Sequence, residues 1–204
     1  MADTLEARLQ LVLDRQEIEK MLATYCRAID RCDLELLKTV YHPDGIDEHG
    51  SFSGNAHEFA EFIIPTLKTV ILDGVHTVTH SLIEVEGDFA TSEAYYWAYQ
   101  RCHGTEAAVT PYFGEDYAAR VKEAGLIDLY HDYYCGGRYI DLFERRDGQW
   151  KILRRRITNE WNDVRPSRRI TSQGALADFN LPGRRDRQDP VYLNTIPVRA
   201  GVAA

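Results

Sequence analysis

Two histidines on a predicted strand and one aspartate at the end of a predicted helix are the residues best suited to acid–base chemistry. His76 and His80 lie four residues apart, which in a regular strand places both side chains on the same face of a sheet. An imidazole has an ordinary pKa of about 6.5 and can act as a base near neutral pH. Asp30 can orient such a histidine, because a carboxylate bonded to one ring nitrogen leaves the other free to accept a proton. The alternative is an ordinary strand histidine and a capping or solvated aspartate.

Tyr25 and Arg155 are further candidates for the same chemistry. Tyr25 precedes Asp30 by five residues, so the two side chains of an ideal helix point about 140° apart, which weakens a paired role. Arg155 is the middle of three consecutive arginines on a predicted strand, where alternation sends at least one inward. An arginine in a cleft can stabilise an anionic leaving group or a developing enolate. The alternative is a charged edge strand that keeps the sheet soluble.

Aromatic residues are more numerous than a core of this size needs. The 204 residues include 12 Tyr, 7 Phe and 3 Trp, and rings with polar tips are suited to lining a binding site. Core packing explains the aromatic strands equally well. The candidate substrate-binding residues are His76, Tyr95, Trp97, Tyr99, Tyr134, Asn159 and Trp161.

The hydrophobic pattern predicts helices first and an antiparallel sheet afterwards, which indicates the α+β class. Tight turns are predicted at Glu86-Gly87-Asp88 and Arg146-Asp147-Gly148. Pro65 predicts a kink or break in the third helix. The predicted helices cover 3–30, 34–41 and 56–72, and the predicted strands cover 45–49, 76–86, 89–103, 135–146 and 149–161.

Two segments stand apart from this pattern. Residues 104–134 are too long for a hairpin loop and contain a helical stretch, so we expect an insertion over one end of the sheet. Residues 163–204 form an extension with seven Arg against four Asp, expected to pack on its own or a neighbouring subunit; disorder is the alternative. The sequence thus predicts one domain over 1–162 and a C-terminal extension over 163–204.

Composition narrows the class of protein. The 24 Lys and Arg against 32 Asp and Glu give a net charge of −8, which disfavours binding to nucleic acid. The sequence has no apolar run of membrane-spanning length, and its first residues lack the basic start and apolar stretch typical of a signal peptide. We therefore expect a cytoplasmic protein with no membrane partner. The four cysteines lack metal-ligand spacing and are expected to be free thiols. With no nucleotide or metal motif either, we expect no cofactor and no metal.

Residues 10–161 resemble the SnoaL-like branch of the nuclear transport factor 2-like superfamily. The resemblance is carried by Tyr25-Cys-Arg-Ala-Ile-Asp30-Arg-Cys-Asp33, Val40-Tyr-His-Pro-Asp-Gly45, Val75-His-Thr-Val-Thr-His80 and, most specifically, Gly136 to Lys151 with the following arginines. It implies a cone-shaped α+β barrel, cystatin-like, with N-terminal helices packed on a curved sheet. It also implies a helix-end Asp paired with a strand His, as in hexachlorocyclohexane dehydrochlorinase, scytalone dehydratase and bile-acid 7α-dehydratase. By position, Asp30 and His80 match that dyad, Tyr25 matches a helix tyrosine, and Arg155 matches the last-strand arginine.

The resemblance implies a cofactor-independent lyase. In this hypothesis His80, oriented by Asp30, removes a proton from an aromatic or alicyclic small molecule, and Arg155 and Tyr25 assist the departure of water, formaldehyde or another small group. Relatives in lignin catabolism, which remove formaldehyde from diarylpropanes, are similar in scaffold. The alternatives are an isomerase or polyketide-type cyclase and a non-catalytic ligand-binding module. A homo-oligomer is expected, with a trimer favoured over a dimer.

Overall fold

Three N-terminal helices begin at residues that satisfy their free backbone amides. The computed structural model describes residues 4–170, 172–178 and 182–193. Helix α1 (Leu5–Asp30) begins after Thr4, α2 (Leu34–Thr39) after Asp33 and α3 (Ala56–Val70) after Asn55, and each of these capping side chains accepts a hydrogen bond from a first-turn amide. The predicted break at Pro65 is wrong, because α3 runs through it to Val70. Ile64 and Leu67 are buried on either side of the proline, and this packing holds the helix together.

Six strands form one mixed sheet in the order β2-β1-β6-β5-β4-β3. Strand β1 is parallel to β6, and all other neighbours are antiparallel. Two hairpin turns lie where the sequence predicts them: Gly87 has φ 61°, and Asp147 and Gly148 have φ 52° and 74°, the left-handed backbone that two-residue turns require. The strands are β1 (Tyr41–His49), β2 (Phe52–Asn55), β3 (Ile71–Glu86), β4 (Phe89–Cys102), β5 (His131–Arg146) and β6 (Gln149–Pro166).

The strand boundaries differ from the prediction at both edges of the sheet. Strand β3 begins at Ile71, five residues earlier than predicted and within the segment assigned to the third helix. Strand β1 begins at Tyr41, within the segment assigned to the second helix, and β2 was not predicted. A shift in the β1–β6 register between Tyr41 and Ile46 accommodates the Pro43-Asp44-Gly45 stretch that resembles a helix stop. Strand β5 begins four residues earlier than predicted, and β6 continues to Pro166.

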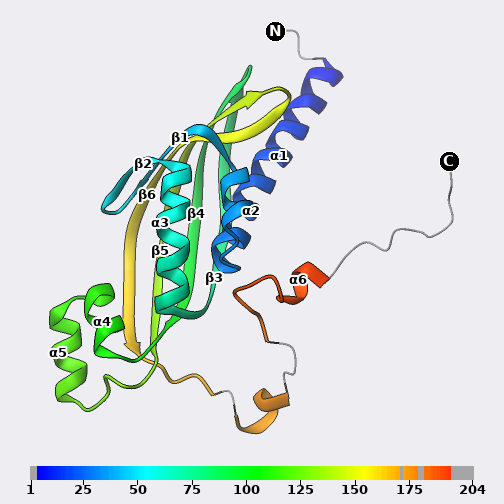
Figure 1. Cartoon of the computed structure of the whole chain (residues 1–204). Helices are drawn as coiled ribbons and strands as arrows, with labels where there is room; N and C mark the ends of the chain where they lie inside the picture. The colour runs from blue at the N-terminus through cyan, green and yellow to red at the C-terminus, as the bar shows by residue number, and fades with distance from the viewer. Residues whose placement is uncertain (1–3, 171, 179–181, 194–204) are drawn as a thin grey trace.

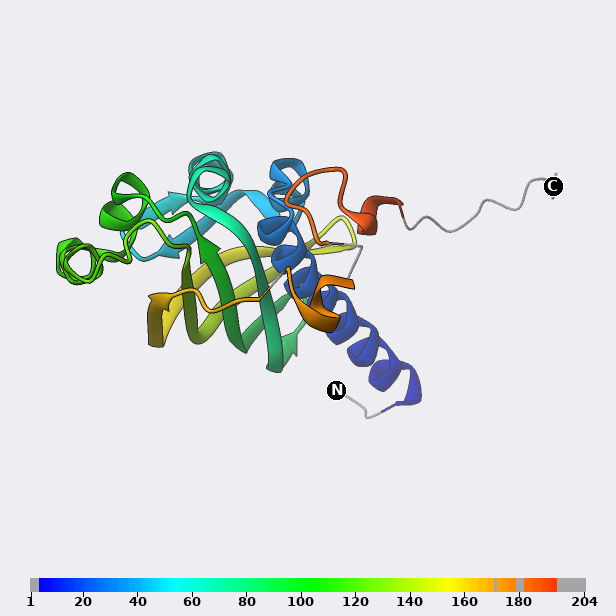
Figure 2. The ribbon, with the colours of Figure 1, turned by 90° about the horizontal axis from the view of Figure 1, so that it is seen from below.

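The helices cover one face of a curved, unclosed sheet. Figures 1 and 2 show α1, α2 and α3 on the same side, with the strands curving beneath them. The main hydrophobic core lies between these two layers and includes Ile18 and Leu22 of α1, Leu37 of α2, and Phe143 and Ile152 of the sheet. This is the α+β architecture that the sequence predicts. None of the described helices is long and apolar enough to cross a membrane.

The two additional segments pack against the ends of these layers. Between β4 and β5, helices α4 (Glu106–Phe113) and α5 (Glu115–Glu123) form a small core of their own around Val109 and Val121. At the C-terminus a 3-10 turn (Gly174–Asp178) is followed by a short helix, α6 (Pro190–Leu193). Residues around α6 are tied to the end of α1 in the same chain, where Arg31 contacts Asp189 at 2.9 Å. Part of the predicted extension (171, 179–181 and 194–204) lies outside the described residues.

Candidate functional site

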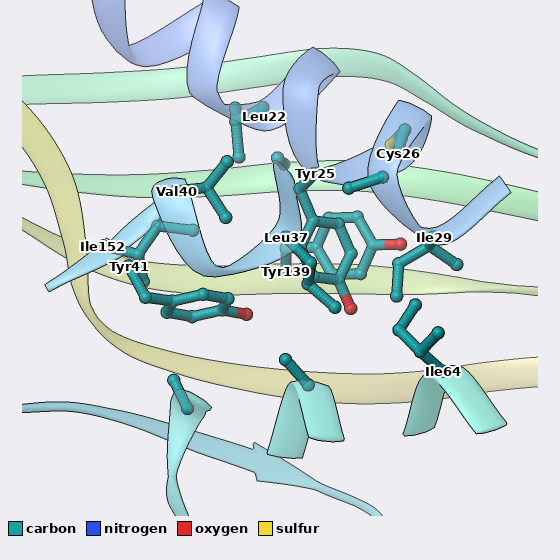
Figure 3. Close-up of a cluster of buried hydrophobic side chains, with 14 of the residues drawn as sticks. Leu22, Tyr25, Cys26, Ile29, Leu37, Val40, Tyr41, Ile64, Tyr139 and Ile152 are labelled. Carbon is teal, nitrogen blue, oxygen red and sulfur yellow. The ribbon is translucent and has the colours of Figure 1, made fainter. Parts of the chain in front are cut away.

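A cavity of about 240 Å³ lies between the helices and the inner face of the sheet. Helix α4 of the insertion closes one side, where the Tyr112 hydroxyl donates a hydrogen bond to Gln100 Oε1 at 2.7 Å. Figure 3 shows Tyr25 of α1 and Tyr139 of β5 side by side under the helix. The cavity is therefore mainly apolar and aromatic, with a few polar groups. Its lining comprises Tyr25, Ile29, His49, Gly50, Ile63, Leu67, His76, Tyr96, Gln100, Tyr112, Tyr133, Cys135, Tyr139, Ile157 and Asn159.

Asp30 and His76 form a hydrogen-bonded pair beside this cavity. Asp30 is the last residue of α1 and is 5% exposed. The His76 Nδ1–H donates to Asp30 Oδ1 at 2.7 Å, and the backbone N–H of His76 lies 3.1 and 3.0 Å from the two carboxylate oxygens. This double attachment fixes both the ring and the strand that carries it. Because Nδ1 faces Asp30 and the ring lines the cavity, Nε2 is left as the proton acceptor on the cavity side.

The predicted pairing of Asp30 with His80 is wrong. The β3–β4 register shifts between Val78 and His80, since Val78 pairs with Tyr96 and His80 pairs with Tyr95. A β-bulge adds one residue to β3 here, and a single extra residue moves every following side chain to the other face. His80 is accordingly exposed, beside Glu19 and Ala23 of α1. His76, predicted only as a substrate-binding residue, is the histidine that contacts Asp30.

Arg155 points inward, as predicted, but it lies behind the cavity wall. Its side chain is fully buried and donates two hydrogen bonds to Asp141, at 2.8 and 2.7 Å. The guanidinium is held between the rings of Tyr25 and Tyr139, 4.0 and 4.3 Å from their centroids. Burial alone would lower the pKa of Arg155, but the Asp141 carboxylate raises it well above the ordinary value. Arg155 thus does not line the cavity itself. It contacts Tyr25 and Tyr139, which do, and fixes their positions.

Three of the predicted binding residues are exposed on the opposite face of the sheet. Tyr95, Trp97 and Trp161 are 47%, 41% and 50% exposed. On β4 the inward positions are Tyr96 and Gln100, one residue out of step with the prediction. On β6 a second register shift, between Gly136 and Gly137 of β5, turns Trp161 outward although Asn159 lines the cavity.

Tyr99 and Tyr134 form a pair on this same outer face. Their ring centroids lie 5.1 Å apart, and the Tyr99 hydroxyl donates to Asp132 at 2.9 Å. Both border a groove that also contains Trp97, and neither lines the cavity. Of the predicted site residues, the structure thus brings Tyr25, His76 and Asn159 together at the cavity, with Asp30 and Arg155 behind them.

A second polar group from β1 was missed by the sequence analysis. Asp47 is completely buried and its Oδ2 accepts a hydrogen bond from the Tyr41 hydroxyl at 2.5 Å. Burial raises the pKa of Asp47 to about 6. His49, two residues later, lines the cavity and stacks on Phe59 at 4.9 Å. Burial, followed by the charge of Arg155, lowers the pKa of His49 to about 4. The alternation of Asp47 and His49 within the predicted strand 45–49 was the available signal, but the sequence analysis assigned these two residues no role.

All four cysteines are free and buried, as expected from their spacing. Within the described part of the chain, no group of three or more His, Cys, Asp and Glu residues is arranged to hold a metal ion.

Solved structures share this fold at low sequence identity. A hexachlorocyclohexane dehydrochlorinase (LinA-type3) from Novosphingobium barchaimii is 16% identical, with a TM-score of 0.60 over 80% of this chain and 96% of its own. A protein of unknown function from Mycobacterium tuberculosis is 23% identical, with a TM-score of 0.56 over 78% of each chain. A protein provisionally assigned as scytalone dehydratase, from Novosphingobium aromaticivorans, is 17% identical, with a TM-score of 0.57 over 74% of this chain and 87% of its own. At these identities the likeness establishes the fold alone.

Sequence comparison gives the family. No functionally curated protein matches the chain. The sequence profile of the SnoaL-like domain matches residues 10–156, which include α1 from its second turn onward, the cavity-facing parts of β3 to β5 and the Arg155–Asp141 pair. The chain therefore belongs to the SnoaL-like domain family, within the cystatin-like, nuclear transport factor 2-like fold class.

Proposed function

We propose that the protein is a cofactor-independent lyase in which His76, oriented by Asp30, is the general base. The observation that carries this proposal is the 2.7 Å contact from His76 Nδ1 to a buried carboxylate at the wall of a partly enclosed, aromatic cavity. A carboxylate in this position fixes the tautomer and stabilises the imidazolium that forms when Nε2 takes a proton. The proposal replaces His80 of the sequence-based hypothesis with His76 and keeps Asp30.

The proposed reaction is an elimination. His76 Nε2 removes a proton from a carbon of the substrate, the C–H electron pair becomes the new π bond, and a small group leaves with the electrons of its own bond. Burial, and then the charge of Asp47, raises the pKa of Tyr25, so its hydroxyl stays protonated and can donate a hydrogen bond to a substrate oxygen. Arg155 is a positioning residue in this scheme, because it acts through the Tyr25 ring that it contacts at 4.0 Å.

The size and lining of the cavity favour a small ring-bearing substrate. A volume of about 240 Å³ is below the usual range of drug-sized sites, which points to one ring rather than a polycyclic molecule. Tyr96 and Tyr139 stack at 4.4 Å within the wall and offer a flat apolar surface to an aromatic or alicyclic ring. Loss of water or chloride fits this step. Loss of formaldehyde would need the same base to remove the O–H proton of a hydroxymethyl group, so that the C=O bond of formaldehyde forms while the C–C bond breaks with its electrons left on the rest of the substrate. The names of the dehydrochlorinase and dehydratase neighbours support elimination as the reaction type.

The alternative enzymatic function is an isomerase or polyketide-type cyclase. The same base would then form an enolate and return the proton elsewhere without expelling a group, so the product would keep the mass of the substrate. A non-catalytic ligand-binding module is less favoured, because a buried carboxylate and imidazole are costly to hold at a cavity without use.

We also propose that the chain assembles with further copies of itself, as a trimer, through the outer face of the sheet. Trp97 and Trp161 flank Gly136 on neighbouring strands of that face, and both are exposed. Arg165, Arg168 and Arg169 border the same aromatic groove, and the chain as a whole is acidic. An aromatic surface with a basic rim is complementary to a second copy of an acidic chain.

The function is tested with two histidines of one strand. Alicyclic and aromatic alcohols, hydroxyketones and chlorides are screened by mass spectrometry for loss of a small group, first with the wild-type protein. His76→Ala should reduce turnover by about 10³-fold or more, and Asp30→Asn by a comparable factor, because the base or its orientation is lost. His80→Ala, a matched change on the exposed face of β3, should leave turnover within about twofold. Equal turnover by His76→Ala and wild type would overturn the mechanism.

A further inference from the structure

Asp47 and His49 place two unsatisfied buried atoms beside each other. Asp47 Oδ1 and His49 Nδ1 are both inaccessible to solvent and have no hydrogen-bond partner among the described residues. The two atoms are 3.7 Å apart, which is longer than a hydrogen bond but within reach of a small movement of either side chain. Buried polar atoms without partners are costly and uncommon, so a facing pair of this kind calls for an explanation.

The pair lies across the cavity from the Asp30–His76 dyad. His49 is on β1 and His76 is on β3, with β6, β5 and β4 between them in the sheet order, and both rings line the same cavity. The His49 side chain is 36% accessible although its Nδ1 is not. Nδ1 therefore faces Asp47 in the interior, and the opposite edge of the ring, with Nε2, is the part that can meet a ligand.

The chemistry of the pair is complementary to that of the dyad. Asp30 has both oxygens occupied by N–H donors of His76, so it acts toward that residue as a hydrogen-bond acceptor. Asp47 is bonded on one oxygen only, by Tyr41, and burial favours its protonated form, whose pKa is raised to about 6. Between about pH 4 and pH 6, where Asp47 is mainly protonated and His49 mainly neutral, the carboxyl can pass a proton to Nδ1 as Nε2 gives its own proton away. One side of the cavity is thus arranged to take a proton and the other to supply one.

We propose that His49, supplied by Asp47, is the general acid that protonates a departing hydroxyl group, so that the reaction is the loss of water. This inference rests on the proposed lyase function and selects among its leaving groups, because chloride departs without a proton whereas hydroxide does not. His76 Nε2 takes the C–H proton, whose electron pair becomes the π bond. The C–O bond breaks with its electrons on oxygen, which takes the Nε2 proton of His49, while Asp47 gives its proton to Nδ1. Water leaves, and the proton on His76 returns to the Asp47–His49 pair through solvent.

Two probes with one common product test the leaving group. β-Hydroxycyclohexanone loses water and β-chlorocyclohexanone loses chloride, and both give cyclohexenone, which is followed by its absorbance above the uncatalysed blank. In His49→Phe, which retains a ring to stack on Phe59, loss of water should slow by about 100-fold and loss of chloride by less than tenfold. Asp47→Asn should show the same imbalance. Equal slowing of both probes would mean that His49 only shapes the cavity, and the inference would be wrong.

The same experiment separates this inference from the proposed function. His76→Ala should stop turnover of both probes, and His80→Ala should affect neither. If His76→Ala is as active as wild type, or if the wild-type protein converts neither probe, the proposed function fails on these substrates whatever His49 does.

The contact between Asp47 and His49 has a readout that does not depend on turnover. In protein labelled with ¹⁵N-histidine, the ring signals of His49 are assigned by their absence from His49→Phe. Asp47→Asn should shift the His49 signals and leave those of His76 in place. Unchanged His49 signals would show that no proton is shared and would overturn the relay.

Discussion

At the scale of single residues, Arg155 and Asp141 illustrate how this protein keeps a charge next to an apolar cavity. Both side chains are 0% exposed, so their desolvation offsets much of their mutual attraction. The pair aligns three strands, because Asp141 and Asp47 are the cross-strand partners of Arg155 on β5 and β1. The Arg155–Asp141 pair therefore holds Tyr25 and Tyr139 at the cavity wall and adds little to the net stability.

Removing one charge of the Arg155–Asp141 pair should lower the free energy of unfolding more than removing both charges. Arg155→Met leaves the Asp141 carboxylate buried without its cation and should lower the free energy of unfolding by about 3–5 kcal/mol. The double variant Arg155→Met/Asp141→Leu should recover at least half of that loss, because no buried charge is left alone. Urea denaturation of the two variants and the wild type measures both quantities. A double variant less stable than the single one would contradict this account.

The titration of Asp47 makes the free energy of unfolding depend on pH. Its pKa is raised to about 6 in the folded chain, by burial first, and by Asp141 and Glu48, against the lowering effects of the Tyr41 hydrogen bond and Arg155; His49 also faces it. An acid whose folded pKa exceeds the unfolded value of about 3.9 binds more protons when folded, so its contribution to stability falls as pH rises from about 4 to 6.

Asp47→Asn removes this titration. Relative to the wild type, the variant should gain roughly 3 kcal/mol of unfolding free energy between pH 4 and pH 7. Urea denaturation at a series of pH values measures the difference, with Asp44→Asn, an exposed aspartate of the same strand, as the control. A difference between Asp47→Asn and wild type that stays constant with pH would show that Asp47 titrates normally.

At the scale of elements, alternation along strands predicts which side chains share a face until a bulge interrupts it, but it does not show which face is inward. Tyr95, Trp97 and Tyr99 share a face of β4, and that face is the outer one. The helices, both hairpin turns and the α+β order follow from caps, periodicity and turn residues that are local in the sequence. The bulge after Val78 is not local in this sense: Thr77-Val78-Thr79 is ordinary strand sequence, and the extra residue appears only against Tyr95 and Tyr96 of β4. Asp30 lies at the end of a helix that the local sequence predicts, so it could be predicted as the orienting carboxylate. Its histidine partner depends on the bulge and could not be predicted.

The second bulge has a visible sequence signal in Gly136-Gly137. A Cβ on Gly136 would lie 2.5 Å from Nε1 of Trp161, and one on Gly137 would lie 1.9 Å from the carbonyl oxygen of Thr158. The two glycines therefore let β6 cross closely where Trp161 turns outward. Only the pairing of β5 with β6 shows which side chain they accommodate, so the outward direction of Trp161 was missed.

Gly136→Ala should destabilise the protein through the Trp161 ring. We expect a loss of about 1–3 kcal/mol, the usual cost of overpacking. Trp161→Ala should relieve most of it when the two changes are combined, because the contact is with that side chain. Gly54→Ala, where the nearest atom to the new Cβ is an ordinary 3.4 Å away, is the control for the general effect of the substitution. Thermal or urea unfolding of the four variants gives the coupling energy between the changes at Gly136 and Trp161. If the losses of the two single variants simply add in the double variant, the contact with the Trp161 ring is not the cause.

At the scale of the whole molecule, the sheet presents two unequal faces. The inner face carries the cavity under α1 and α3, whereas the outer face exposes aromatic side chains and a small ion cluster in which Arg138 contacts Glu93 and Glu160, each at 2.7 Å. A second apolar stripe, Leu5, Leu9, Val12 and Leu13, lies on the N-terminal half of α1, which projects away from the sheet (Figure 2). Of these surfaces, only the sheet face combines apolar rings with paired charges and a basic rim, the composition expected of an interface between subunits.

Assembly through the sheet face makes a prediction that is independent of catalysis. Trp97→Glu places a charge at the centre of the aromatic surface and should convert the proposed trimer into monomer, as measured by light scattering coupled to gel filtration. Phe62→Glu, a matched change at a residue 53% exposed on α3, should keep the wild-type mass. Because the cavity is lined by residues of its own chain and Trp97 is not among them, monomeric Trp97→Glu should retain the Asp30–His76 pair and most of its turnover. A wild-type protein that is already monomeric, or a Trp97→Glu variant of unchanged mass, would exclude this face as the interface.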